Sequence, residues 1–280
     1  MRAIEVSGTS MGWEINCYQH CQHGCLYCYA RTMEKKTYRE WIKPEPRYQV
    51  VDWLIKDIDE LNDIPQLRAQ IKDILLCGCT DGYQGLESDY GITREVITIL
   101  ADHDLPFTVL TKNTNVMRDV EVFKEYDNCR VGFSIITTDD NLRQLLEPNA
   151  SPIEERCKSI EKLKEEGVST YCCIEPIMPD KKSDPIRIVK RLKDYVDLFG
   201  FGKWNPYAKK LVKERLGIDY NDEFYLNIFN ELIPYCEQEK IKYGIVKHSQ
   251  QFLRSYGIRF LPTQLVSDIP YVGPNDIVGK

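Results

Sequence analysis

Short apolar segments alternate with amphipathic segments along most of this chain, and no other feature restricts its fold as strongly. The expected strands are short and apolar: residues 13–17, 71–77, 106–111, 130–137, 168–176 and 241–246. The expected helices are longer: residues 48–61, 93–102, 116–126, 153–166, 185–195 and 222–238. Repeated strand–helix–strand units join parallel strands through right-handed crossovers. The alternation therefore predicts the α/β class, as a partial (β/α)6 barrel of the TIM type with a C-terminal helical extension.

This pattern also suggests a division of the chain and a place for its chemistry. We expect a barrel core over residues 1–200 and an extension over 201–280 that packs on the barrel mouth or covers it. In parallel barrels the residues that follow the strands face one common mouth. Here they carry reactive or polar side chains at Cys17, Cys77, Cys79, Thr80, Asp81, Thr111, Lys112, Ser134 and Glu175, with Pro176 beside them. An active site is therefore expected at that mouth.

Eleven cysteines are present, and their number needs an explanation. The N-terminus lacks an apolar signal core, and no stretch approaches the roughly 18 to 20 apolar residues that span a bilayer. We therefore expect a cytoplasmic protein without a membrane partner, in which structural disulfides are unusual. Some of the cysteines are then expected to bind metal.

Three cysteines, Cys21, Cys25 and Cys28, form a C-x3-C-x2-C motif. This spacing lets one tight loop present three thiolates to three irons of a [4Fe–4S] cubane, with Gly24 easing the backbone turn. A cluster with three protein ligands leaves one iron open to a substrate, which indicates chemistry rather than simple electron storage. The alternative is a structural zinc site completed by Cys17, His20 or His23.

The motif, with Tyr27 inside it and Tyr29-Ala30-Arg31 after it, resembles the radical S-adenosylmethionine (radical SAM) superfamily. Further stretches resemble its spore photoproduct lyase-like branch: residues 80–84, Thr111-Lys112, Ser134-Ile135, residues 146–148, and Glu175-Pro176-Ile177 followed by Pro179. The resemblance covers roughly residues 13 to 190. It implies that residues 1–200 form a radical SAM core that binds a [4Fe–4S] cluster and S-adenosylmethionine.

The resemblance also implies roles for individual residues. Tyr27 would lie near the adenine of S-adenosylmethionine, Thr80 and Asp81 near its amino group, and Lys112 with Ser134 near its carboxylate. Glu147 would either bind the ribose or cap a loop, and Pro176 would belong to the same cofactor-binding set. A lysine at a buried strand end needs an anionic partner, although Lys112 could also be an ordinary solvated lysine.

Cys79 resembles the cysteine with which spore photoproduct lyase donates a hydrogen atom to its product radical. Tyr29 or Tyr83 would relay that radical. The alternative for Cys79 is a simple buried cysteine.

The resemblance implies a lyase-like radical enzyme that abstracts hydrogen through a 5′-deoxyadenosyl radical and is reduced by a donor such as flavodoxin or ferredoxin. Its substrate would be a nucleic-acid lesion or a nucleotide, with a modified peptide or small metabolite as alternatives. The net charge of −6 offers no general attraction for a polyanion. One basic stretch, residues 203–215, suits phosphate contacts but equally suits a solvated helix face. The alternative from another class is a non-catalytic iron–sulfur electron carrier or redox sensor.

Overall fold

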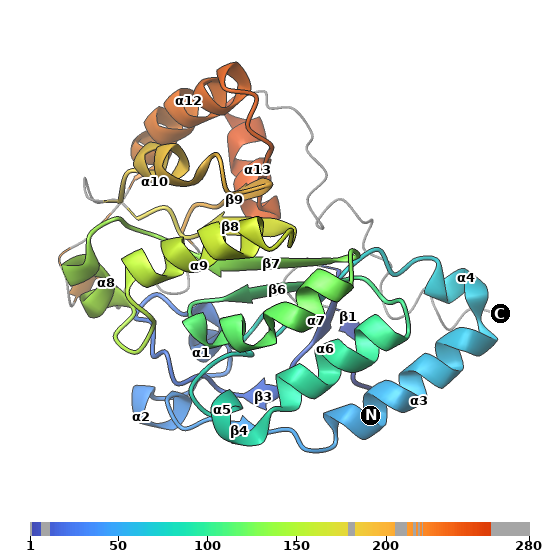
Figure 1. The fold of residues 1–280 in the computed structure, drawn as a ribbon. Helices are drawn as coiled ribbons and strands as arrows, with labels where there is room; N and C mark the ends of the chain where they lie inside the picture. Colours follow the sequence, from blue (N-terminus) through green and yellow to red (C-terminus); the bar gives the residue numbers. More distant parts are fainter. Residues whose placement is uncertain are drawn as a thin grey trace.

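The computed structural model describes residues 2–6, 12–178, 183–204, 212–214, 217, 219 and 221–258. Its centre is an eight-stranded sheet in the order β1-β2-β5-β6-β7-β8-β9-β10 (Figure 1). Every neighbouring pair is parallel except β1 and β2. The strands are β1 (Glu5–Val6), β2 (Trp13–Ile15), β5 (Ile74–Leu76), β6 (Phe107–Thr111), β7 (Cys129–Ser134), β8 (Thr170–Ile174), β9 (Leu198–Phe201) and β10 (Tyr243–Ile245). This largely parallel sheet confirms the predicted α/β class.

The principal helices lie between successive strands. They are α3 (Val50–Asp63), α6 (Ile92–Asp102), α7 (Val120–Glu125), α9 (Ile153–Glu165), α10 (Pro185–Leu192), α12 (Asp222–Gln238) and α13 (Lys247–Ser255). In Figure 1, α3, α6, α7 and α9 run along the same face of the sheet. The helix expected over 116–126 begins instead as a 3₁₀ helix, η1 (Thr114–Asp119), before continuing as α7. Such tighter turns are common at helix ends.

Sequence reasoning missed several short elements. The strand β9 was overlooked because Leu198-Phe199-Gly200-Phe201 is a short run that contains a glycine. The remaining elements are α1 (Tyr29–Met33), α2 (Tyr38–Trp41), α4 (Pro65–Arg68), α5 (Glu87–Tyr90), α8 (Asp140–Leu146), and the antiparallel pair β3 (Tyr18–Gln19) and β4 (Glu45–Pro46). They are too short to show a hydrophobic period, yet most of them surround the cysteine motif.

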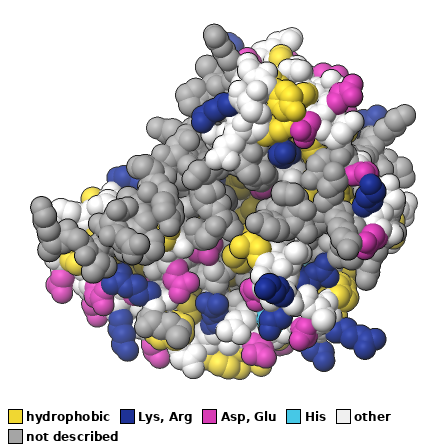
Figure 2. Space-filling model, turned by 180° about the vertical axis from the view of Figure 1, so that it is seen from behind, with side chains coloured by type: hydrophobic (Ala, Val, Ile, Leu, Met, Phe, Trp, Pro, Cys, Tyr) yellow, Lys and Arg dark blue, Asp and Glu magenta, His cyan; other side chains and the backbone are white. Residues whose placement is uncertain are grey.

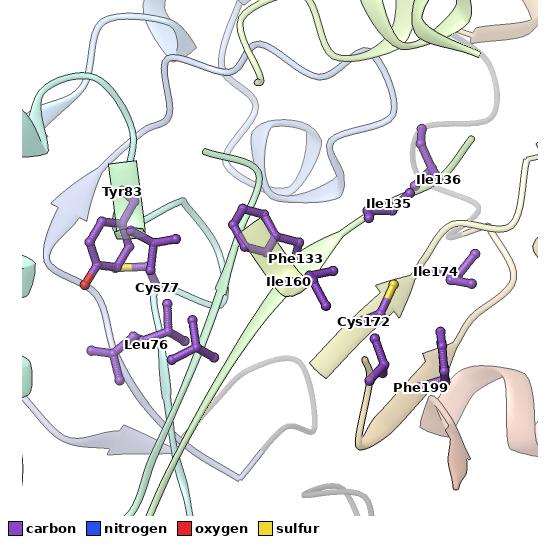
Figure 3. Close-up of a cluster of buried hydrophobic side chains, with 14 of the residues drawn as sticks. Leu76, Cys77, Tyr83, Phe133, Ile135, Ile136, Ile160, Cys172, Ile174 and Phe199 are labelled. Carbon is purple, nitrogen blue, oxygen red and sulfur yellow. The ribbon is translucent and has the colours of Figure 1, made fainter. Parts of the chain in front are cut away.

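Alternate residues of each strand point to opposite faces of the sheet, so the sheet lies between two apolar layers. Figure 3 shows one layer, in which Phe133 of β7 and Cys172 of β8 lie near Ile160 of α9. Full burial of a side chain such as Phe133 or Ile160 contributes about 1.5–3 kcal/mol. On the opposite side of β8, Tyr171 packs in a separate small cluster. A Cβ on Gly200 would lie 2.1 Å from the Tyr171 hydroxyl, so glycine there makes room for the tyrosine ring.

The parallel register aligns the carboxyl ends of the strands. Ile15 pairs with Leu76, and Leu76 with Val109, so the residues that follow β2, β5 and β6 emerge at one edge of the sheet. The sheet continues past residue 200, because β10 pairs with β9. The expected cover of the mouth by residues 201–280 depends on segments such as 259–280 that lie outside the described residues. No helix in the described part is both long and apolar enough to cross a bilayer.

Candidate active site at the carboxyl ends of the strands

The three motif cysteines lie on one loop, residues 20–28, which we call the cysteine loop. It connects β3 to α1. Cys21 and Cys25 are buried and Cys28 is half-buried. Gly24 has a left-handed backbone with φ of +61°, and a Cβ there would lie 2.7 Å from the Tyr38 hydroxyl. Both the conformation and the space therefore require glycine at this turn.

Burial shapes the chemistry of the three thiols. It raises the pKa of Cys25 to about 12, and it also raises the pKa values of Cys21 and Cys28. A bound metal deprotonates a coordinating thiol outright, so thiols with raised pKa values can still serve as cluster ligands. Among the described residues, no three Cys, His, Asp or Glu side chains already converge on a point that suits a single metal ion. A cubane does not need such convergence, because it takes one thiolate on each of three irons.

Asp81 connects the cysteine loop to the ends of β5 and β6. Its carboxylate accepts from His23 Nε2 at 2.9 Å, from Thr111 Oγ1 at 2.7 Å, and from the main-chain N–H groups of Lys112 and Tyr83 at 2.8 and 2.9 Å. Burial alone would raise the pKa of Asp81, but His23 and the other donors outweigh it and hold that pKa at about 2. Asp81 therefore stays ionised at neutral pH, with four donors from the protein itself.

His23 lies between two of the motif cysteines and is only 2% exposed. Its second ring nitrogen, Nδ1, lies 3.1 Å from the carbonyl oxygen of Asn149. Both ring nitrogens of His23 therefore face an acceptor oxygen, a carboxylate on one side and a carbonyl on the other. His23 thus fixes the middle of the loop to two other segments of the chain.

Two amide side chains hold the loop backbone directly. Gln84, which is fully buried, accepts from the Gln22 N–H at 2.8 Å and donates to the His20 carbonyl at 3.2 Å. Asn149 donates from its side chain to the Gln22 carbonyl at 2.7 Å. These side chains therefore pair polar groups of the loop backbone that no regular secondary structure satisfies.

Glu147 forms a second buried carboxylate network. It accepts from the Tyr27 hydroxyl and from Arg156 Nη1, the latter at 2.7 Å, and Glu147 and Arg156 are both fully buried. Burial raises the pKa of Glu147, but the charges of Arg156 and Lys112 overcome that effect and lower it. Arg156 also donates to the main-chain oxygen of Ser134. The network fixes the Tyr27 ring and ties it to the end of β7.

Lys112 and Thr80 bring polar groups to the site that form no hydrogen bond with another described residue. Within the described part of the chain, the Lys112 ammonium has no hydrogen bond or ion pair, and it lies 5.9 Å from the centre of the Tyr27 ring. Burial lowers the pKa of Lys112, but nearby Cys25 and Glu147 reverse that effect and raise it. The Thr80 hydroxyl is buried and lacks a hydrogen-bond partner among the described residues. A free cation and a free hydroxyl suit the carboxylate and ammonium of an amino acid.

Cys79 packs beside the cysteine loop together with Tyr29. Burial and the charge of Glu14 raise the pKa of Cys79 to about 12, so its thiol keeps its hydrogen at neutral pH. Tyr29 donates its hydroxyl to the Gly78 carbonyl at 3.0 Å. Tyr83 lies apart from this pair: its ring is near Cys77 (Figure 3) and its hydroxyl donates to Asp119 at 2.8 Å. The structure thus brings Tyr29, rather than Tyr83, to Cys79.

The remaining sequence-predicted residues have definite places. Ser134 and Pro176 are buried at the ends of β7 and β8. Cys17, a candidate fourth zinc ligand, is buried against Cys77, whose sulfur lies 3.4 Å from the Cys17 N–H. Of the other two candidates, His20 faces Glu34 at 3.7 Å and His23 binds Asp81. Pro179 and most of the basic stretch, including Tyr207, Lys209, Lys210 and Arg215, lie outside the described residues.

Sequence reasoning missed three residues of this site. Arg156 was not predicted because an arginine in an amphipathic helix is usually exposed to solvent. Asn149 was not predicted because it lies in a loop, where no pattern marks it. Gln84 was noticed only as part of a motif. A buried arginine could have been suspected from the nearby Glu147, because a buried carboxylate needs a cation.

Comparisons with known proteins agree with this geometry. Residues 15–192 match the family model described as the radical SAM superfamily. An uncharacterized protein of Methanocaldococcus jannaschii, MJ0683, is 29% identical over 211 residues, which cover 75% of this chain and 77% of that protein.

Two solved structures share the fold. Spore photoproduct lyase complexed with dinucleoside spore photoproduct superimposes with a TM-score of 0.67 at 15% identity, covering 87% of this chain and 78% of the lyase. SuiB of Streptococcus suis bound to S-adenosylmethionine superimposes with a TM-score of 0.59 at 14% identity, covering 89% and 53%. SuiB has also been solved with its precursor peptide SuiA. At these identities the likeness concerns the fold.

Proposed function

Because the chain belongs to the radical SAM superfamily, whose cofactors are a [4Fe–4S] cluster and S-adenosylmethionine, we propose that Cys21, Cys25 and Cys28 ligate that cluster. When bound, the two cofactors supply reductive cleavage of the sulfonium carbon–sulfur bond, giving methionine and a 5′-deoxyadenosyl radical. The single observation that carries the assignment is the cysteine loop, which the Asp81 and Glu147 networks hold at the strand ends beside an unpaired lysine. A non-catalytic iron–sulfur carrier has no need of that lysine.

The chain's own residues fit S-adenosylmethionine in a consistent way. We propose that Lys112 binds its carboxylate and Thr80 its amino group, because both offer free polar groups beside the loop. Tyr27, held by Glu147, presents its ring for contact with the adenine. Asp81 already accepts four hydrogen bonds, so its part is to position Lys112 and His23 close to the amino acid end of the cofactor. Ser134 and Pro176 complete the wall of this site.

We further propose a lyase-like reaction in which hydrogen is abstracted from a nucleic-acid lesion or nucleotide, and Cys79 returns a hydrogen atom to the product radical. Cys79 is suited to this role because its thiol retains hydrogen and lies beside Tyr29. Once the S–H bond has given its hydrogen atom to the product radical, the sulfur radical can take a hydrogen atom from the Tyr29 hydroxyl, which leaves the radical on Tyr29. The fold shared with spore photoproduct lyase supports a lesion substrate, and the fold shared with SuiB makes a peptide the alternative.

The test is the production of 5′-deoxyadenosine by the anaerobically reconstituted, dithionite-reduced protein, with and without ultraviolet-irradiated DNA. Stimulation by irradiated DNA would support lesion repair, whereas unstimulated production would support the cofactor chemistry and leave a peptide or metabolite to be tried. A fully loaded cluster that yields no 5′-deoxyadenosine would refute the proposal.

Two cysteine variants make the ligand assignment specific. Cys28→Ala is expected to abolish 5′-deoxyadenosine production, because it removes one of only three thiolates. Cys17→Ala is the matched control, since Cys17 lies against Cys77, and it should retain both the cluster and the product. Loss of the cluster in Cys17→Ala would instead show a fourth thiolate ligand.

A further inference from the structure

The surface that covers the cysteine loop differs in charge from the rest of the chain. Residues 31–47, which include α2 and β4, contain six Lys or Arg and three Glu, whereas the whole chain has 37 Lys or Arg against 43 Asp or Glu. In Figure 2, the view from behind, Lys and Arg side chains gather at the lower right, the region that α1 and α2 occupy at the lower left of Figure 1. We call this region the α1–α2 surface.

Four of the six cations of the α1–α2 surface are both exposed and unpaired. Lys35, Lys36, Arg39 and Lys43 are all exposed, and none forms an ion pair within the described part of the chain. Two of the three acidic residues beside them have local partners: Glu34 faces His20, and Glu40 completes a capping box with Thr37, which leaves only the exposed Glu45. The surface therefore presents free positive charge.

Several cations elsewhere are paired, although single exposed lysines such as Lys72, Lys162 and Lys240 are not paired with any described residue. On α9, Lys158 pairs with Glu154 and Lys164 with Asp197. On α10, Arg191 pairs with Glu161. Even a surface ion pair contributes only about 0–1 kcal/mol to stability. Exposed cations that form no ion pair are therefore not needed for stability. Four such cations in one segment of an acidic protein favour the approach of an acidic partner.

The same surface lies directly over the cysteine loop. The N–H of Cys21 donates to the Trp41 carbonyl at 3.1 Å, and the Trp41 side chain, 1% exposed, packs against Cys21 and Ala30. The His20 ring lies 5.4 Å from the Trp41 ring. One layer of aromatic side chains thus separates the proposed cluster ligands from the basic exterior.

We infer that the α1–α2 surface docks a small acidic one-electron carrier protein of the flavin or iron–sulfur type, which delivers electrons to the cluster through this thin layer. The inference rests on the proposed function and adds the place where its reductant binds. In the transfer, one electron passes from the reduced carrier to the oxidised cluster, and no bond forms or breaks. Charge complementarity and a short path to the cluster are both met at this surface.

The test compares two charge-reversed triple variants of the cluster-loaded protein. The docking variant is Lys35→Glu, Lys36→Glu and Lys43→Glu. The control is Lys72→Glu, Lys162→Glu and Lys240→Glu, three exposed lysines that lie near the amino ends of β5, β8 and β10, at the opposite edge of the sheet. Both variants change the net charge equally.

With photoreduced flavodoxin at low salt, the docking variant should form 5′-deoxyadenosine about 10-fold more slowly than wild type, and added salt should narrow the gap. Calorimetric titration with oxidised flavodoxin should show that the docking variant also binds flavodoxin more weakly than wild type does. With dithionite, which needs no docking surface, both variants should match wild type. The control should also match wild type with flavodoxin.

Equal flavodoxin-driven rates and equal affinities in all three proteins would overturn the inference, as would the same loss in the control. If dithionite gives no product even in wild type, the proposed function fails. The calorimetric comparison still decides the docking surface in that case.

Discussion

Two buried carboxylates hold the cysteine loop, and they use different kinds of partner. Asp81 is surrounded by four donors, two of them main-chain N–H groups, and it fixes where the backbone of the loop and of β6 runs. Glu147 depends on one arginine and one tyrosine hydroxyl, and it fixes where the Tyr27 ring lies. A charge that accepts from four separate donors tolerates the loss of one better than a charge whose main partner is one arginine.

The largest effect is expected from breaking the Glu147 network. Arg156→Met leaves Glu147 as a fully buried charge without its cation, which should lower the free energy of unfolding by about 3–5 kcal/mol. Urea unfolding of the variant and wild type measures this loss. Arg191→Met, which removes an exposed partner of Glu161, should change it by about 0–1 kcal/mol. Equal losses in the two variants would contradict the contrast between buried and exposed pairs.

The Asp81 network should show a smaller loss with a pH signature. Asp81→Asn weakens charge-assisted hydrogen bonds to His23 and Thr111 and should cost about 2–3 kcal/mol at neutral pH. Because the folded pKa of Asp81 is about 2 and the reference value is 3.8, its charge contributes about 2 kcal/mol above pH 3.8 and loses it as the pH falls toward 2.

Acid titration of cluster-free protein tests this window. Wild type should lose stability between about pH 4 and pH 2 more steeply than Asp81→Asn. The control Asp104→Asn, at an exposed position, should follow wild type. If Asp81→Asn loses stability with falling pH as steeply as wild type does, a carboxylate other than Asp81 causes the acid-dependent loss.

Lys112 lies near both carboxylates, and replacing it tests the binding of S-adenosylmethionine rather than stability. Lys112→Met removes the free cation while keeping a side chain of similar length, so S-adenosylmethionine should bind about 10–100-fold more weakly. Anaerobic calorimetry of the cluster-loaded protein measures the change, with Lys72→Met as the control. Unchanged affinity in Lys112→Met would show that the carboxylate of the cofactor binds elsewhere.

The smallest effect is expected at Asn149. Asn149→Ala removes one exposed side-chain hydrogen bond to Gln22 but keeps the carbonyl that faces His23, so it should cost about 0.5–1 kcal/mol. Urea unfolding measures this as well. A loss as large as that of Asp81→Asn would mean that the side chain, rather than the carboxylate, is the main anchor of the loop.

Much of the fold was predictable because the strands and main helices follow local hydrophobic patterns. Each of the six expected strands overlaps an observed strand, and α12 has the predicted bounds. The short elements around the cysteine loop were not predictable, since α2 has only four residues and β3 has two. The chain folds there because of long-range hydrogen bonds, which leave no periodic trace in the sequence.

The sequence by itself determined the cysteine spacing, the order of strands and helices, and the polar residues at the strand ends. These are properties of neighbouring residues and need no knowledge of distant ones. Only the tertiary structure decided that His23 binds Asp81, 58 residues away, and that Tyr27 binds Glu147, 120 residues away. Such pairs arise because a buried polar group must find a partner wherever the folded backbone brings one, and sequence separation does not restrict that choice.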